Sequence, residues 1–275
     1  MEKILLALDA TNLNTQALDF ACWLGALTHS KITGVFLENL VADEKLVLQE
    51  MRSSSQSTWQ TDIAIDEFSK KKETVEKNIA FFKQACERRS TRYAVHRDAK
   101  EIIRESRYAD ILVIDAETSF NKKFEGTPTA FTKDILTNAE CPVVIAPENF
   151  EGIEEIVFTC DGSKSSMFAI KQFCYLFPQL DDKKVTLLQV NEEGKIAAEE
   201  KEQLKEWISS HYSSIGFETL HGDAETGLPG YLLKKKNAFI VMGAYGRNML
   251  SLFFKHSRAE VLIKTITQAI FITHS

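Results

Sequence analysis

Short apolar runs alternate along the chain with stretches that have helical periodicity. Residues 4–8 form a nearly continuous apolar run that ends at Asp9, and Ala17, Phe20 and Leu24 follow at helical spacing. A continuous run indicates a strand buried on both faces, as in a parallel sheet, and a spacing of three or four indicates an amphipathic helix. The pattern therefore predicts an α/β protein.

The opening strand and helix recur at a constant separation of 152 residues. Residues 4–9 correspond to 156–161, and the strand at 31–39 corresponds to 183–191. In the helix between these strands Ala17, Cys22 and Leu24 correspond to Ala169, Cys174 and Leu176. Two unrelated strand–helix units would have no reason to keep one separation through strand, helix and strand. The pattern predicts that a domain has been duplicated.

Further apolar runs complete both copies. In the first copy they follow an insertion at residues 41–90, which reads as a short helix, a polar loop and a long charged helix. The additional strands are predicted at residues 93–95, 111–114 and 143–145, and at 217–220, 239–242 and 270–272. Alternating strands and helices are typical of a doubly wound sheet. We therefore expect two tandem doubly wound domains, residues 1–147 and 153–275, each a five-stranded parallel sheet flanked by helices, with a linker starting at Pro147.

Composition limits the classes of function. Hydrophobic residues make up 44% of the chain and charged residues 26%, as in ordinary globular proteins. The net charge of -6 disfavours binding to nucleic acid, which needs a basic surface. The five cysteines contain no Cys-x-x-Cys pair, so buried reduced thiols are expected. The opening apolar run is too short for a signal segment, and no later run approaches a membrane span. These features predict a cytoplasmic protein that does not contact membranes.

Candidate chemistry follows the strand at residues 239–242. Gly243 and Gly246 would let backbone N–H groups approach an anion closely, and Arg247 follows them. His256 and Ser257 precede a stretch of helical spacing, where Ser257 suits the N-cap of a helix whose exposed N–H groups attract phosphate. The histidines show no spacing typical of metal ligands, and no esterase elbow, P-loop or convincing general base is present. Neither a metal site nor a catalytic residue is predicted.

The spacing of these residues resembles a motif of the universal stress proteins. The ATP-binding members of that family carry the pattern G-x2-G-x9-G-[S/T] before the last helix. Gly243, Gly246 and Ser257 match it, and His256 replaces the third glycine. The resemblance implies an adenine nucleotide alpha-hydrolase-like fold and a site for ATP or AMP. It also implies that Asp161, Gly162 and Ser163 match the turn after the first strand, and that Val190 supplies backbone contacts to adenine. Asp161 could hold Mg beside a phosphate, although capping is the more common role of such an aspartate.

The two copies differ at this loop. At this loop the first copy reads Asp115-Ala116-Glu117-Thr118, with two carboxylates and no glycine, and it has Thr129-Ala130 where the second has His256-Ser257. Carboxylates repel a polyphosphate, so nucleotide is expected only in the second copy. Arg247 and His256 would add positive charge there, whereas a non-glycine residue at 256 would cost about 1–2 kcal/mol if the backbone is left-handed.

Two classes of function follow. The leading hypothesis is a stress-response module that binds an adenine nucleotide in its second domain and has no designed catalysis. The alternative is a ligand-free stress or scaffold protein that acts through protein–protein contacts. The fold's relatives include ATP-using enzymes, so slow ATP hydrolysis is a third hypothesis, against which the missing base counts. Resemblance to the family also suggests a homodimer through exposed edges.

Overall fold

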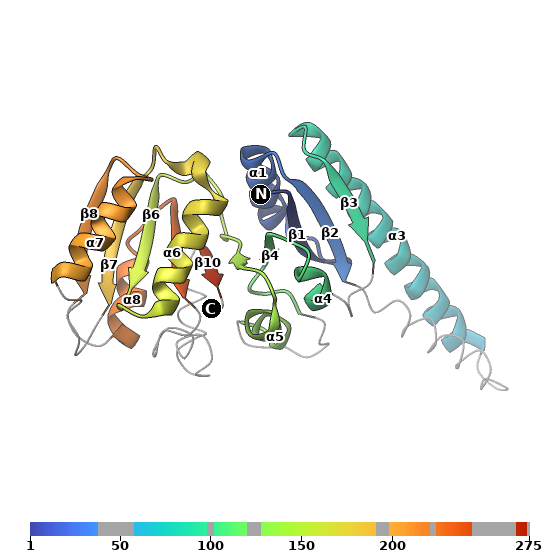
Figure 1. Ribbon diagram of the computed structural model, residues 1–275. Helices are drawn as coiled ribbons and strands as arrows, with labels where there is room; N and C mark the ends of the chain where they lie inside the picture. The colour runs from blue at the N-terminus through green and yellow to red at the C-terminus, as the bar shows by residue number, and fades with distance from the viewer. Residues whose placement is uncertain are drawn as a thin grey trace.

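The computed structural model of the chain describes residues 1–37, 58–97, 102–119, 128–190, 198–220, 224–243 and 268–273. Strands and helices alternate through both halves (Figure 1). The first half comprises β1 (Lys3–Asp9), α1 (Thr15–Thr28), β2 (Lys31–Leu37), α3 (Thr58–Arg88), β3 (Tyr93–His96), α4 (Ile102–Ser106), β4 (Ile111–Ile114), α5 (Ala130–Asn138) and β5 (Val143–Ile145). The second half comprises β6 (Glu155–Cys160), α6 (Lys164–Leu176), the 3-10 turn η2 (Pro178–Leu180), β7 (Lys184–Val190), α7 (Ala198–Ser209), β8 (Ile215–Leu220), α8 (Ala224–Leu232), β9 (Ala238–Gly243) and β10 (Ala269–Thr273).

The described strands form one sheet in the order β3-β2-β1-β4-β5-β10-β9-β6-β7-β8. Each half therefore has its first strand at the centre, flanked by its second and fourth strands. The pairs within each half are parallel, and β5 and β10 join the halves as an antiparallel pair. The predicted α/β class with five parallel strands per half is confirmed. The two sets of strands are continuous across an antiparallel seam rather than separate sheets.

Both faces of the sheet are buried, which explains the continuous apolar runs. In β1, Ile4 and Leu6 belong to the cluster that contacts α1, α3, α6 and α7, whereas Leu5 and Ala7 belong to the cluster under α4, α5 and α8. Successive side chains of a strand point to opposite faces, so a strand covered on both sides needs apolar residues throughout. Helices on both faces make this a doubly wound sheet.

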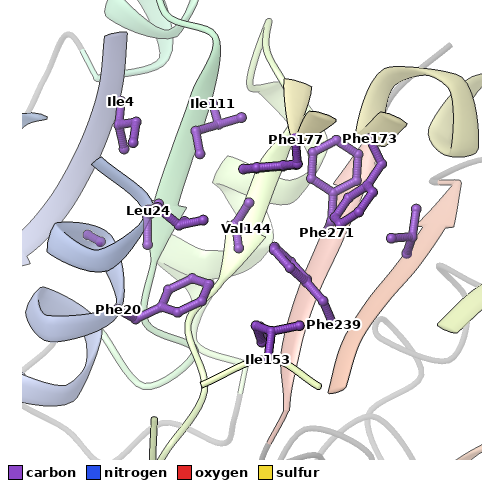
Figure 2. Close-up of a cluster of buried hydrophobic side chains, with 14 of the residues drawn as sticks. Ile4, Phe20, Leu24, Ile111, Val144, Ile153, Phe173, Phe177, Phe239 and Phe271 are labelled. Carbon is purple, nitrogen blue, oxygen red and sulfur yellow. The ribbon is translucent and has the colours of Figure 1, made fainter. Parts of the chain in front are cut away.

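The larger core cluster crosses from one half into the other. The ring centroids of Phe20 and Phe239 lie 5.9 Å apart, although one ring comes from α1 and the other from β9. Phe173 of α6 lies 5.3 Å from Phe271 of β10 (Figure 2). Phe150, from the connection between the halves, packs on Trp23 with centroids 5.0 Å apart. Edge-to-face and tilted contacts of this kind stabilise a core beyond the area that they bury. The halves therefore share one apolar layer.

The register of β7 corrects part of the sequence comparison. Ile4 pairs with Ile32 in the first half, but Ile156 pairs with Val185 in the second. The separation of 152 residues therefore holds for the first strand and helix, and one extra residue precedes β7. A shift of one residue would turn every side chain of the strand to the other face of the sheet. Because β7 pairs one residue later, its side chains keep the same faces as those of β2. Thr33 and Thr186, both 1% exposed, therefore hold equivalent positions in the two halves.

None of the helices that the structure describes is both long enough and apolar enough to cross a lipid bilayer.

Candidate functional site

The edge formed by the carboxyl ends of β6, β7 and β9 brings three of the predicted site segments together. Strand β6 lies between β7 and β9 and is parallel to both. Asp161 directly follows β6, Val190 ends β7 and Gly243 ends β9. In open α/β sheets, ligands bind beyond this edge, near the point where the strand order reverses. The topology thus places residues that are distant in sequence at one candidate site.

A tight turn joins β6 to α6. The Ser163 N–H donates a hydrogen bond of 2.9 Å to Oδ1 of Asp161, and Gly162 has a φ of 78°. The Ser163 hydroxyl caps α6 by accepting a hydrogen bond of 3.1 Å from the N–H of Ser166. Glycine suits the left-handed conformation at residue 162 because it has no Cβ. Asp161 and Ser163 therefore have structural roles in this turn.

Gly243 is required by close packing against α6. A Cβ added at Gly243 would lie 2.5 Å from the carbonyl carbon and oxygen of Ser165. Only glycine allows the end of β9 to approach the first turn of α6 so closely. Anion approach was the role predicted for Gly243 from the sequence, and this packing contact was not predicted. Gly246, Arg247, His256 and Ser257 lie outside the described residues.

The corresponding edge of the first half contains a cavity of about 350 Å³. Asp9 ends β1, Asp115 directly follows β4, and Asn14 caps α1 at the same edge. The Asn14 amide donates a hydrogen bond of 2.8 Å to Oδ2 of Asp115. Sequence reasoning did not anticipate a cavity here, although carboxylates and amides after adjacent strands were a signal for one. The carboxylates and amides that line the cavity are those of Asp9, Asn12, Asn14, Asp115 and Glu117.

Asp9 repeats the capping role of Asp161. Its Oδ1 accepts hydrogen bonds from the N–H of Thr11 at 2.8 Å and from the N–H of Asn12 at 3.0 Å. Aspartate commonly binds the backbone two residues ahead in such turns. Asp9 thus stabilises the turn after β1 as Asp161 stabilises the turn after β6.

Threonine hydroxyl groups form hydrogen bonds at the start of α5, beside this cavity. Thr129 caps the helix, accepting a hydrogen bond of 3.2 Å from the Thr132 N–H and donating one to the Thr118 carbonyl oxygen. The Thr132 hydroxyl donates to the carbonyl oxygen of Asp115 at 3.2 Å. These hydrogen bonds join the described residues 115–118 of the first half to the start of α5. Together with the carboxylates, this arrangement disfavours a polyphosphate.

Among the described residues, no group of three or more His, Cys, Asp or Glu side chains is placed to hold a metal ion.

Comparison with known proteins gives a match of fold. No protein-family model matches the sequence, and no curated protein matches it. A universal stress protein from Archaeoglobus fulgidus DSM 4304 superposes with a TM-score of 0.62 at 15% identity, covering 99% of this chain and 98% of the other. The chain has the universal stress protein fold.

Two Pseudomonas aeruginosa structures also match over the whole chain. A candidate universal stress protein from strain UCBPP-PA14 has a TM-score of 0.54 at 14% identity, covering 100% of this chain and 93% of the other. A protein of unknown function from strain PAO1 has a TM-score of 0.55 at 15% identity, covering 100% and 92%. The universal stress protein fold thus accounts for both halves of the molecule.

Proposed function

We propose that this chain is a stress-response module of the universal stress protein type that binds one adenine nucleotide, ATP or AMP, in its second half. The observation that carries the proposal is the contrast between Gly243 and Asp115 at equivalent strand ends. In this proposal residues 1–147 and 153–275 are the two domains, and the protein is a cytoplasmic binding module rather than a catalyst.

The equivalence of these two residues follows from strand pairing. Ile4 of β1 pairs with Ile111 of β4, and Ile156 of β6 pairs with Phe239 of β9. Asp115 lies four residues after Ile111, and Gly243 lies four residues after Phe239, so the two residues are equivalent. A carboxylate at this edge repels phosphate, whereas glycine brings no negative charge to it.

The proposed site uses both the described edge and the sequence that follows it. Phosphates would lie over Gly243, Gly246 and the helix start at Ser257, with Arg247 and His256 adding positive charge. Adenine would lie near Val190, and the turn of Asp161, Gly162 and Ser163 would line the floor of the site. One carboxylate beside a nucleotide's phosphates suits the way proteins hold Mg²⁺, so Asp161 is the residue for that ion.

Calorimetry with ATP and AMP tests this proposal, together with mass spectrometry of natively purified protein for retained nucleotide. We expect one nucleotide per chain. Gly246→Asp should abolish binding, because charge-assisted hydrogen bonds contribute about 1.5–3 kcal/mol each and micromolar affinity is only about -8 kcal/mol in total. Glu117→Gln in the first half is the matched control and should leave affinity unchanged.

Two results would contradict the proposal. Two nucleotides per chain would remove the asymmetry between the halves. No binding at millimolar nucleotide, by either the wild type or His256→Gly, would favour the ligand-free scaffold instead. Phosphate release from ATP, measured in the same samples, should stay at the background rate.

We also propose a homodimer that uses the outer edges of the sheet. Strands β5 and β10 pair with each other inside the chain, so they are not available to a second copy. Among the described strands β3 and β8 are the outermost, and their outer backbone groups are the natural template for a further strand. Light scattering across micromolar concentrations should detect the dimer, and a strict monomer would exclude it.

A further inference from the structure

Two buried thiols face each other between α1 and α3. The sulfur atoms of Cys22 and Cys86 lie 3.8 Å apart, and neither side chain is exposed to solvent. All five cysteines of the chain are free and buried. We propose that Cys22 and Cys86 form a reversible disulfide when the protein meets hydrogen peroxide, which would clamp α3 onto α1.

The second half supplies an internal comparison for this site. Cys174 of α6 is the counterpart of Cys22 at the separation of 152 residues, and both are buried against the same face of the sheet. The phenol of Tyr212 hydrogen-bonds Cys174, whereas the thiol of Cys86 contacts Cys22. Cys160 contacts the Ser166 hydroxyl at 3.8 Å and the backbone of Gly162, not a second thiol. The paired thiols therefore depend on α3, which belongs to the insertion of the first half.

The surroundings give the two thiols different acidities. The hydrogen bond from the Cys86 thiol lowers the pKa of Cys22 despite its burial, and the Arg89 cation acts in the same direction. The same hydrogen bond, followed by burial, raises the pKa of Cys86. Burial raises the pKa of Cys141 and of Cys174 to about 12 in each case. The thiolate is the reactive form of cysteine, so Cys22 is the attacking group and Cys86 the resolving group.

The position of Cys86 near the end of α3 provides access for a small oxidant. The Cys86 carbonyl oxygen accepts hydrogen bonds from the N–H groups of Arg89 at 3.2 Å and Thr91 at 2.9 Å, which close the helix. Helix ends fray more readily than core strands open. Opening of this last turn exposes both sulfur atoms, and a shift of about 2 Å then brings them to bonding distance.

The reaction balances with hydrogen peroxide as the oxidant. The Cys22 thiolate attacks one peroxide oxygen, so an S–O bond forms, the O–O bond breaks and hydroxide leaves and takes up a proton as water. The Cys86 thiol then attacks the Cys22 sulfur and loses its proton, the S–S bond forms, the S–O bond breaks, and the departing hydroxide takes up that proton as a second water. Two thiols and one peroxide give one disulfide and two waters, and the two electrons pass from sulfur to oxygen.

Peptide mapping of the full-length protein tests this proposal. The protein is treated with hydrogen peroxide, quenched with catalase, unfolded, alkylated and digested with trypsin. Residues 4–31 and 84–88 each form a tryptic peptide with a single cysteine. We expect these peptides to be joined, to separate on reduction, and to leave alkylation only at Cys141, Cys160 and Cys174. Free alkylated thiols at Cys22 and Cys86 after this treatment would overturn the proposal.

Variants separate the two steps. In Cys86→Ser we expect Cys22 to stop as a sulfenic acid that dimedone traps, whereas Cys174→Ser should still form the cross-link. The oxidised wild type should unfold at a higher temperature than the reduced protein, and dithiothreitol should reverse the shift. Dimedone labelling of Cys174 or Cys160 in place of Cys22 would contradict the assignment of Cys22 as the cysteine that attacks peroxide.

Discussion

Val144 and Phe271 lie opposite each other in the antiparallel pair of β5 and β10. Val144 is the middle residue of β5 and Phe271 the middle residue of β10. These strands hold the same position in the two halves, so the halves meet through equivalent residues. An antiparallel pair of equivalent strands relates the halves by an approximate two-fold axis, as in an isologous dimer. One chain thus has an internal interface of the kind that usually joins two.

Phe271 should be essential to this seam. Its ring is fully buried against Phe173 and Phe177, so Phe271→Ala should lower the free energy of unfolding by about 3–5 kcal/mol. Phe168, also aromatic but 37% exposed, is the matched control, and Phe168→Ala should cost much less. Urea denaturation measures both. Because the core crosses the seam, we expect one cooperative transition in the wild type, and two separate transitions would contradict a shared core.

Gly243 should not tolerate a methyl group. The Cβ of Gly243→Ala would meet the Ser165 backbone at 2.5 Å, so this change should destabilise the protein by about 1–3 kcal/mol or more. Gly230 in α8 is the control, because a Cβ there meets no atom within 4 Å. Gly230→Ala should stabilise the protein by up to about 1 kcal/mol, since alanine favours helix. Equal midpoints in thermal unfolding would show that β9 and α6 are not packed as described.

Glu155 should make stability depend on pH. Burial raises its pKa, but the Thr186 hydroxyl and the Lys235 and Lys184 ammonium groups outweigh burial and lower the pKa below its usual range. The folded protein therefore binds fewer protons than the unfolded chain, whose glutamate pKa is about 4.3. The stabilisation is present above that value and is lost as pH falls through the folded-state pKa.

Glu155→Gln should accordingly lower the free energy of unfolding by about 1–3 kcal/mol at neutral pH. The difference from wild type should shrink in acid. Glu140, whose exposed carboxylate pairs with Arg107 at 2.6 Å, is the comparison, and Glu140→Gln should change stability little at any pH. Denaturation curves from acid to neutral pH check this prediction. If the stability difference between wild type and Glu155→Gln grew as pH fell, the pKa of Glu155 would not be lowered in the folded protein.

The departure from the family pattern at His256 can be tested directly. If bound phosphate requires a left-handed backbone at residue 256, His256→Gly should tighten ATP binding about tenfold, because relief of about 1–2 kcal/mol corresponds to that change in affinity. Titration calorimetry measures the dissociation constants. Weaker binding by the variant would instead show that the imidazole contributes to holding the phosphates.

Hydrophobic periodicity was sufficient to predict the α/β class, the five strands of each half and the equivalence of Asp9 with Asp161. These features depend on local pattern, because a strand buried on both faces must be apolar at nearly every position. The candidate site was predictable in part: the turn at Asp161 and the end of β9 at Gly243 follow strands whose carboxyl ends had to share one edge. The cavity beside Asp115 was not predicted, because it depends on how two turns pack against each other.

The amino-acid pattern by itself determined which segments become strands and helices, and that most of them form parallel units. Only the tertiary structure decided the one-residue shift before β7, the antiparallel seam at Val144 and Phe271, and the contact between Cys22 and Cys86. The physical reason is the range of the interactions. Periodicity records whether a residue is buried, whereas register, edge pairing and contacts between distant helices depend on which surfaces meet when the whole core closes.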